Sequence, residues 1–69
     1  MPSSAIRYIA YDEARRELQV GFVDGGDYAY EGVEPQVHRA FRQAPSKGRF
    51  FAQEIRGHYP YRRVRRREG

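Results

Sequence analysis

Apolar and polar side chains alternate along the first half of the chain. Leu18, Val20 and Phe22 are separated by polar residues or glycine, which is the two-residue period of a strand with one buried face. Enrichment in β-branched and aromatic residues favours one strand before it, from Ile6 to Tyr11, and a third after it, over residues 27–31. Because only short polar turns separate these segments, the pattern predicts a three-stranded antiparallel β-meander.

The spacing of apolar residues then changes to that of helices. From Val33 to Ala44 they recur every three or four positions, and Pro35 suits a first helical turn, where its missing N–H loses no hydrogen bond. Pro45 ends this helix, and Ser46 is a good N-cap for a second helix that runs to about Arg56. The predicted fold class is therefore α+β, in the order β-β-β-α-α, with both helices packed on one face of the sheet.

The length and composition predict one small globular domain. The chain has 69 residues, of which 39% are hydrophobic and 32% charged, and it contains no cysteine. We expect a single domain over residues 1–61, followed by a basic C-terminal tail over 62–69. Neither disulfides nor a structural metal is expected. The sequence has no apolar stretch of membrane-spanning length and no signal peptide pattern, so we expect no membrane insertion and a cytoplasmic location.

The net charge of +4 is divided unevenly along the chain. Residues 1–34 carry three basic and seven acidic side chains, whereas residues 35–69 carry ten basic and two acidic ones. Twelve of the thirteen cations are arginine, whose planar guanidinium suits phosphates and stacks on aromatic rings. This asymmetry would orient the domain toward a polyanion.

Arginines and tyrosines are interleaved near the C-terminus, as in surfaces that bind single-stranded or looped RNA. Arginine binds phosphates through charge-assisted hydrogen bonds, and tyrosine rings stack on unpaired bases. The candidate nucleic-acid-binding residues are Lys47, Arg49, Arg56, His58, Tyr59, Tyr61, Arg62, Arg63, Arg65 and Arg66. Two alternatives are a solubilising tail without a partner and a contact with an acidic protein or membrane surface.

Two further features have both a structural and a functional interpretation. The segment from Ser46 to Arg49 begins the second predicted helix, where free N–H groups can bind an anion, although capping alone explains the serine. Tyr28 and Tyr30 point to the same face of a strand. They fill the core if the helices cover that face, or stack on bases if it is open. In so small a domain we favour the core.

The order of these motifs resembles the KTSC domain, a short domain named for its occurrence at the C-terminus of some lysyl-tRNA synthetases and also found as stand-alone bacterial proteins. The resemblance spans roughly residues 4–63. It rests on residues 4–12, the Leu-x-Val-x-Phe pattern at 18–22, the Tyr-x-Tyr motif at 28–30, and residues 33–37, 44–51, 55–56 and 59–61. Two positions depart from the family pattern, namely Glu34, where a proline often follows the valine, and Ala52, where an asparagine often follows the aromatic pair. The resemblance implies RNA binding, with tRNA as one candidate.

Catalysis is not expected, and neither is a cofactor or a bound metal. The chain has no cysteine nucleophile, and the spacing of His38 and His58 does not favour an acid–base pair. We therefore predict a small non-catalytic binding module that binds RNA, either tRNA or another structured or single-stranded RNA, through an Arg/Tyr-rich basic surface. The alternative is a protein–protein adaptor or weak homodimer that uses a sheet edge.

Overall fold

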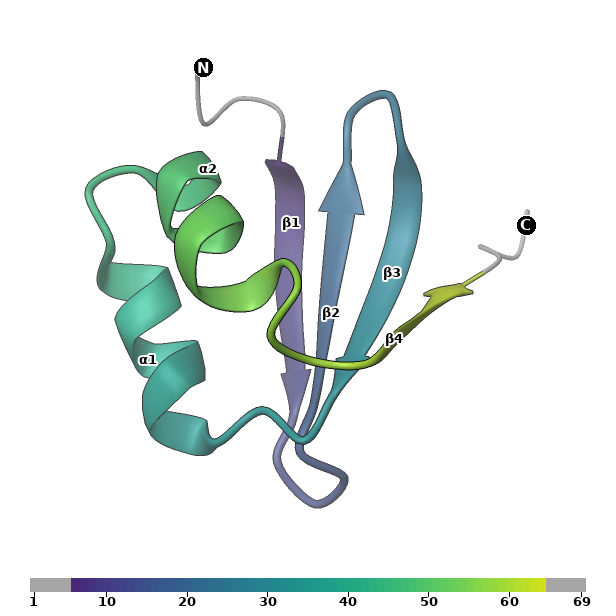
Figure 1. The fold of residues 1–69 in the computed structure, drawn as a ribbon, viewed down its shortest axis with the longest axis vertical. Helices are drawn as coiled ribbons and strands as arrows, with labels where there is room; N and C mark the ends of the chain where they lie inside the picture. Colours follow the sequence, from purple (N-terminus) through teal and green to yellow (C-terminus); the bar gives the residue numbers. More distant parts are fainter. Residues whose placement is uncertain (1–5, 65–69) are drawn as a thin grey trace.

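A four-stranded antiparallel sheet and a helical layer make up the fold (Figure 1). The computed structural model describes residues 6–64. The strands, in both sequence and spatial order, are β1 (Ile6–Asp12), β2 (Glu17–Phe22), β3 (Gly26–Glu31) and β4 (Tyr61–Val64). The helical segments are α1 (Pro35–Gln43), α2 (Lys47–Phe50) and the π-helical turn η2 (Phe51–Ile55). The predicted α+β class is confirmed, and the three predicted strands are all present.

The fourth strand corrects the predicted three-stranded meander. Tyr61 pairs with Tyr30 of β3, and Val64 pairs with Asp27. Arg62 and Arg63, which the sequence placed at the start of a basic tail, therefore lie within the sheet. An arginine-rich segment pairs here because the free edge of β3 presents backbone N–H and C=O groups that need partners. Residues 65–69, including the candidates Arg65 and Arg66, lie outside the described residues.

The core lies between the sheet and the helices. Leu18 and Val20 of β2, Phe41 of α1 and Ile55 of η2 have no exposed surface and belong to one cluster. Fully burying one such side chain contributes roughly 1.5–3 kcal/mol. This cluster therefore holds the helical segments against one face of the sheet, which we call the helical face.

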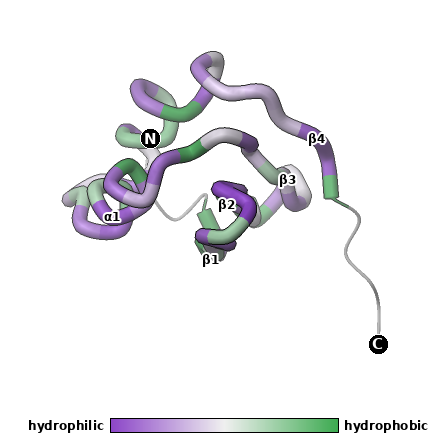
Figure 2. The backbone as a smooth tube through the Cα atoms, turned by 90° about the horizontal axis from the view of Figure 1, so that it is seen from below, coloured by the Kyte–Doolittle hydropathy of each residue, from purple (hydrophilic) through white to green (hydrophobic). Residues whose placement is uncertain are grey.

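The second helix begins and ends close to the predicted residues, but its second half is π-helical. The Ser46 hydroxyl accepts a hydrogen bond from the backbone N–H of Arg49 at 3.2 Å, which confirms the N-cap. After Phe50 the helix widens into a π-turn, in which the N–H of Arg56 donates to the carbonyl of Phe51 at 2.9 Å. The segment that follows crosses the helical face of the sheet to reach β4 (Figures 1 and 2).

A polar network covers part of the opposite face, which we call the outer face. The Tyr8 hydroxyl donates to the carboxylate of Asp27 at 2.6 Å and accepts from the Gln19 amide at 2.8 Å. The Tyr8 ring lies across Gly21, where a Cβ atom would overlap it. Asp27 is only 5% exposed, so the hydrogen bond from Tyr8 gives a buried carboxylate a partner, and Gln19 supports the Tyr8 hydroxyl.

Candidate nucleic-acid interface

Strand β4 separates its side chains between the two faces of the sheet. Arg63 is the register partner of Tyr28, and Tyr61 is the partner of Tyr30. Since successive residues of a strand point to opposite faces, Tyr61 and Arg63 lie on the helical face and Arg62 lies on the outer face. The basic run that looked uniform in the sequence therefore contributes to two different surfaces.

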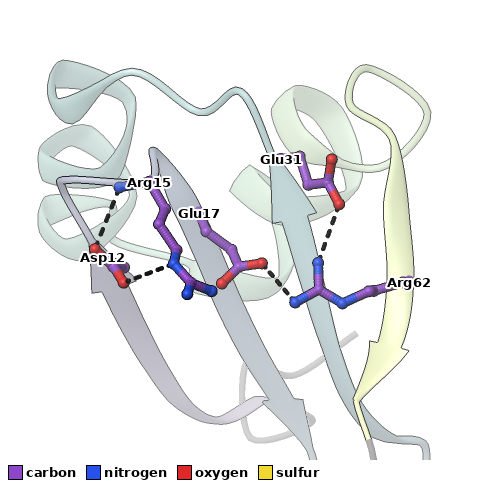
Figure 3. A network of polar contacts seen from close by, with 5 residues as sticks. All are labelled: Asp12, Arg15, Glu17, Glu31 and Arg62. Atoms are coloured by element: carbon purple, nitrogen blue, oxygen red, sulfur yellow. Dashed lines mark hydrogen bonds and ion pairs between the residues drawn. The ribbon is translucent and has the colours of Figure 1, made fainter.

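Arg62 serves the fold. Its guanidinium lies 2.7 Å from the carboxylate of Glu17 and 3.0 Å from that of Glu31 (Figure 3). These two carboxylates are direct register partners across β2 and β3, where like charges repel. The hydrogen bond to Glu17, followed by the charge of that residue, raises the pKa of Arg62 above its ordinary value. Arg62 thus bridges two carboxylates of the sheet on the outer face.

Five aromatic rings form a closed circuit on the helical face, which we call the aromatic belt. The ring centroids lie 5.1 Å apart for Phe22–Phe51, 5.5 Å for Phe51–Tyr30, 5.4 Å for Tyr30–Tyr61, 5.7 Å for Tyr61–Tyr28 and 6.1 Å for Tyr28–Phe22. Most contacts are edge-to-face, the arrangement that aromatic pairs favour. Burial decreases from one side of the belt to the other, because Tyr30 is 5% exposed and Tyr61 is 61% exposed.

The two tyrosines of the Tyr-x-Tyr motif differ in burial. Tyr30 is part of the core, as favoured from the sequence, and burial raises the pKa of its hydroxyl. Tyr28 is half-buried and packs against the core from its margin. Tyr61 leaves the largest aromatic surface open to solvent. It is the belt residue best placed to stack on a base.

Three exposed arginines surround the belt and the helical segments next to it. Arg63 extends over the start of β3, where its Nη2 atom would lie 3.2 Å from a Cβ atom on Gly26. Arg56 follows η2, and its charge partly offsets the burial that raises the pKa of Tyr30. None of the ion pairs formed among residues 6–64 involves Arg49, Arg56 or Arg63. Their charges therefore remain available to an anionic partner.

A groove of about 740 Å³ continues from the belt between the helical segments and the sheet. Phe22 and Phe51 belong to both the belt and the groove, and Arg49 and Arg56 also line it. Ala52, one of the two departures from the family pattern, is exposed and is among the lining residues. The groove places an apolar surface next to two cations.

The remaining candidates lie in other environments. The Lys47 ammonium donates to the carbonyl of Ala44 at 3.0 Å, so it caps the end of α1 rather than projecting freely. Tyr59 packs against the core, and His58 is exposed. Sequence reasoning missed Phe22 and Phe51 as members of the site. The alternation of apolar residues in the second predicted strand indicated only that Phe22 faces the core. The residues around Phe51 carry no signal that it contacts Phe22, because that contact depends on the tertiary structure.

Residues 6–64 show neither a metal site nor a membrane-spanning helix. Among residues 6–64 there is no group of three histidine or acidic side chains arranged to hold a metal ion. No helix in the same range has the length and apolar character needed to cross a membrane.

Comparison with known proteins agrees with this architecture. The sequence model of the KTSC domain matches residues 2–59. A crystal structure of a KTSC domain protein from Yersinia pestis superposes with a TM-score of 0.88, at 41% identity, and the match covers 93% of this chain and 90% of that one. The two proteins therefore share the whole fold.

Two curated relatives differ greatly in length. An uncharacterized protein from Stutzerimonas stutzeri is 40% identical over 65 residues, which cover 93% of this chain and 92% of the relative. A lysine–tRNA ligase from Nostoc punctiforme is 31% identical over 61 residues, which cover 88% of this chain but only 11% of the ligase. The chain thus corresponds to nearly all of one relative and to a small part of the other.

Proposed function

The chain belongs to the KTSC domain family, and we propose that it is an RNA-binding module whose contact surface is the helical face beside β3 and β4. The observation that carries this proposal is the position of Tyr61 and Arg63. Strand alternation directs both to the face that carries the aromatic belt. An exposed ring beside cations that have no carboxylate partner among residues 6–64 is the chemistry that single-stranded nucleic acids require.

We assign separate roles to the arginines and to Tyr61. Arg56 and Arg63 contact phosphates, and a base stacks on the open face of Tyr61. Arg62 holds β4 in the sheet through Glu17 and Glu31 on the opposite face. Phosphate contacts position a nucleic acid without reading its sequence, so we expect weak sequence selectivity.

The tRNA candidate is supported by one relative. The Nostoc punctiforme protein is named a lysine–tRNA ligase, and a segment of it is similar to most of this chain. We therefore propose tRNA as the first RNA to test. The similarity to that ligase does not indicate which residues of this chain would contact tRNA.

Neighbouring arginines provide a matched test. Arg62→Gln and Arg63→Gln remove the same charge from adjacent positions of β4, on opposite faces. Fluorescence anisotropy with bulk tRNA and with a short single-stranded RNA should show several-fold weaker binding for Arg63→Gln. Its salt slope should fall by about one unit, as expected when one phosphate contact is lost. Arg62→Gln should stay within about twofold of the wild type at the same salt concentration, since it lies outside the contact surface.

The same titration tests the proposal as a whole. Wild-type affinity that does not change between low and physiological salt would contradict phosphate-dominated binding. The amide signals of β3 and β4 in both variants test whether β4 stays paired, since Arg62 helps to hold it in the sheet. Equal losses in two variants that both keep β4 paired would contradict the assignment to the helical face.

A sheet-edge adaptor remains the second candidate function. Strand β1 is seven residues long and is the first strand in the sheet order, so one of its edges has no strand partner among residues 6–64. An edge of this kind can pair with a strand from another chain. Sedimentation at increasing protein concentration, with and without RNA, distinguishes the two functions. Dimers that form regardless of RNA would favour the adaptor.

A further inference from the structure

The groove beside η2 combines aromatic side chains with two arginines. It is bounded by Phe50 and Phe51, by Phe22 at the end of β2 and by Ile6 at the start of β1. Phe22 and Phe51 meet edge to face, and each is only half-buried. Aromatic surface therefore remains accessible inside a groove of about 740 Å³. That volume lies within the range of about 300–1,000 Å³ typical of small-molecule sites.

The charges of the groove have one sign. Among residues 6–64, its ionisable lining residues are Arg49 and Arg56, and no acidic side chain from that range lines it. Neither arginine forms an ion pair with another residue in the range 6–64. A ligand that matches this lining has a flat apolar part and an adjacent anionic group.

We propose that this groove binds one unpaired nucleotide of an RNA strand, with the base against Phe22 and Phe51 and its phosphate at Arg49 and Arg56. This inference rests on the RNA-binding function proposed above. An aromatic ring stacks on any base through its π-face, and arginine forks match phosphate oxygens. A nucleotide is a flat base joined to a phosphate, so it fits both parts of the lining.

Continuity with the aromatic belt distinguishes a nucleic acid from other anions. The Phe22–Phe51 pair forms one side of the groove and also belongs to the ring circuit that leads through Tyr28 to Tyr61. A strand with one base on Tyr61 can therefore place another base in the groove without leaving this surface. Paired bases are stacked inside a helix and cannot present their faces in this way. The domain should consequently prefer unpaired RNA to duplex RNA.

Filling the groove tests this inference. Ala52 is exposed and lines the groove, whereas Ala40 is exposed on α1 and does not line it. We expect Ala52→Trp to weaken binding of a short single-stranded RNA by about tenfold, as the loss of one stacked base would. Binding of a duplex RNA of the same length should change by less than about twofold. The matched control, Ala40→Trp, should alter neither affinity.

A second variant and a direct titration keep the test decisive if the tryptophan variant does not fold. Ala52→Glu introduces a negative charge at the groove and should also weaken single-strand binding. In the wild-type protein, a nucleoside 5′-monophosphate should shift the amide signals of Arg49, Ala52 and Gln53. The nucleoside alone and inorganic phosphate alone should each produce smaller shifts at the same concentration, since each matches only part of the lining.

The outcomes separate this inference from the RNA-binding function. If single-stranded RNA binds the wild type and Ala52→Trp with equal affinity, the groove assignment is wrong while RNA binding on the helical face stands. If the wild type binds no RNA, the proposed function fails and the binding of an RNA strand in the groove fails with it; a monophosphate that still shifts these amides would then show a site for free nucleotides only. A peptide with an aromatic residue and a free carboxylate that shifts the same amides more strongly than the monophosphate would overturn the nucleotide assignment.

Discussion

The guanidinium of Arg62 lies 2.7 Å from the carboxylate of Glu17, and this contact joins β4 to a strand that is not its neighbour. The guanidinium reaches across β3, where it also meets Glu31 at 3.0 Å. Because Glu17 and Glu31 are direct register partners, the arginine relieves a repulsion that the sheet would otherwise contain. A residue from the basic run near the C-terminus thus stabilises the sheet.

Removing this contact should destabilise the protein in a salt-dependent way. We expect Arg62→Gln to lower the melting temperature by a few degrees at low ionic strength, since Glu17 and Glu31 then face each other without a cation. The loss should shrink at high salt, which screens the repulsion between exposed charges. Thermal unfolding followed by circular dichroism measures both effects.

Arg39→Gln is a suitable control, because Arg39 is exposed on α1 and makes no ion pair within residues 6–64. An equal shift in both variants would argue against the contact.

The two tyrosines at opposite ends of the burial gradient should respond differently to truncation. Tyr30→Ala should cost about 3–5 kcal/mol in the free energy of unfolding, the range for removing a large buried aromatic side chain. Tyr61→Ala should cost less than about 1 kcal/mol, since Tyr61 is 61% exposed. Urea denaturation measures these costs, and anisotropy with single-stranded RNA should show a binding loss for the folded Tyr61→Ala protein. Unchanged RNA affinity in that variant would remove Tyr61 from the interface.

Protonation of His38 should weaken the fold. Its ring stacks on Tyr11 at a centroid distance of 4.5 Å. Burial, with smaller contributions from Arg42 and Arg39, lowers the pKa of His38 below its ordinary value of 6.5. The unfolded chain therefore takes up the proton more readily than the folded protein does. The contribution of His38 to stability is fully present above about pH 6.5 and declines as the pH falls through its folded-state pKa.

The variant His38→Gln isolates this contribution. Between neutral pH and about pH 5, the wild type should lose more free energy of unfolding than the variant does, because glutamine does not titrate. Urea denaturation at several pH values provides the comparison. Parallel pH profiles for the two proteins would show that His38 makes no such contribution.

A methyl group at Gly21 should disturb the outer face. A Cβ atom there would overlap the Tyr8 ring, and moving that ring would break its 2.6 Å hydrogen bond to Asp27. We expect Gly21→Ala to cost about 1–3 kcal/mol in the free energy of unfolding, from overpacking and a weakened buried hydrogen bond. In a Tyr8→Ala background the same substitution should cost less. A double-mutant cycle measures this coupling, and strictly additive effects would exclude it.

Much of the fold follows from local signals that are present in the sequence. The alternation around Leu18 and Val20 predicted a strand with one buried face, and both residues have no exposed surface. Pro35 and Ser46 predicted where the helices begin, because an N1 proline and an N-cap serine act within a single turn. Signals of this kind depend only on neighbouring residues, so they can be read without knowing the tertiary structure.

The candidate site depended on contacts between distant segments. Strand β4 forms only because β3 offers a free edge about thirty residues earlier in the chain, a relationship that no local pattern of apolar residues marks. Strand pairing then decided that Arg63 shares the face of the aromatic belt and that Arg62 forms ion pairs with Glu17 and Glu31 on the opposite face. The sequence by itself determined the number of basic and aromatic side chains near the C-terminus. Only the tertiary structure decided which of them share a face, because that choice depends on the register between strands.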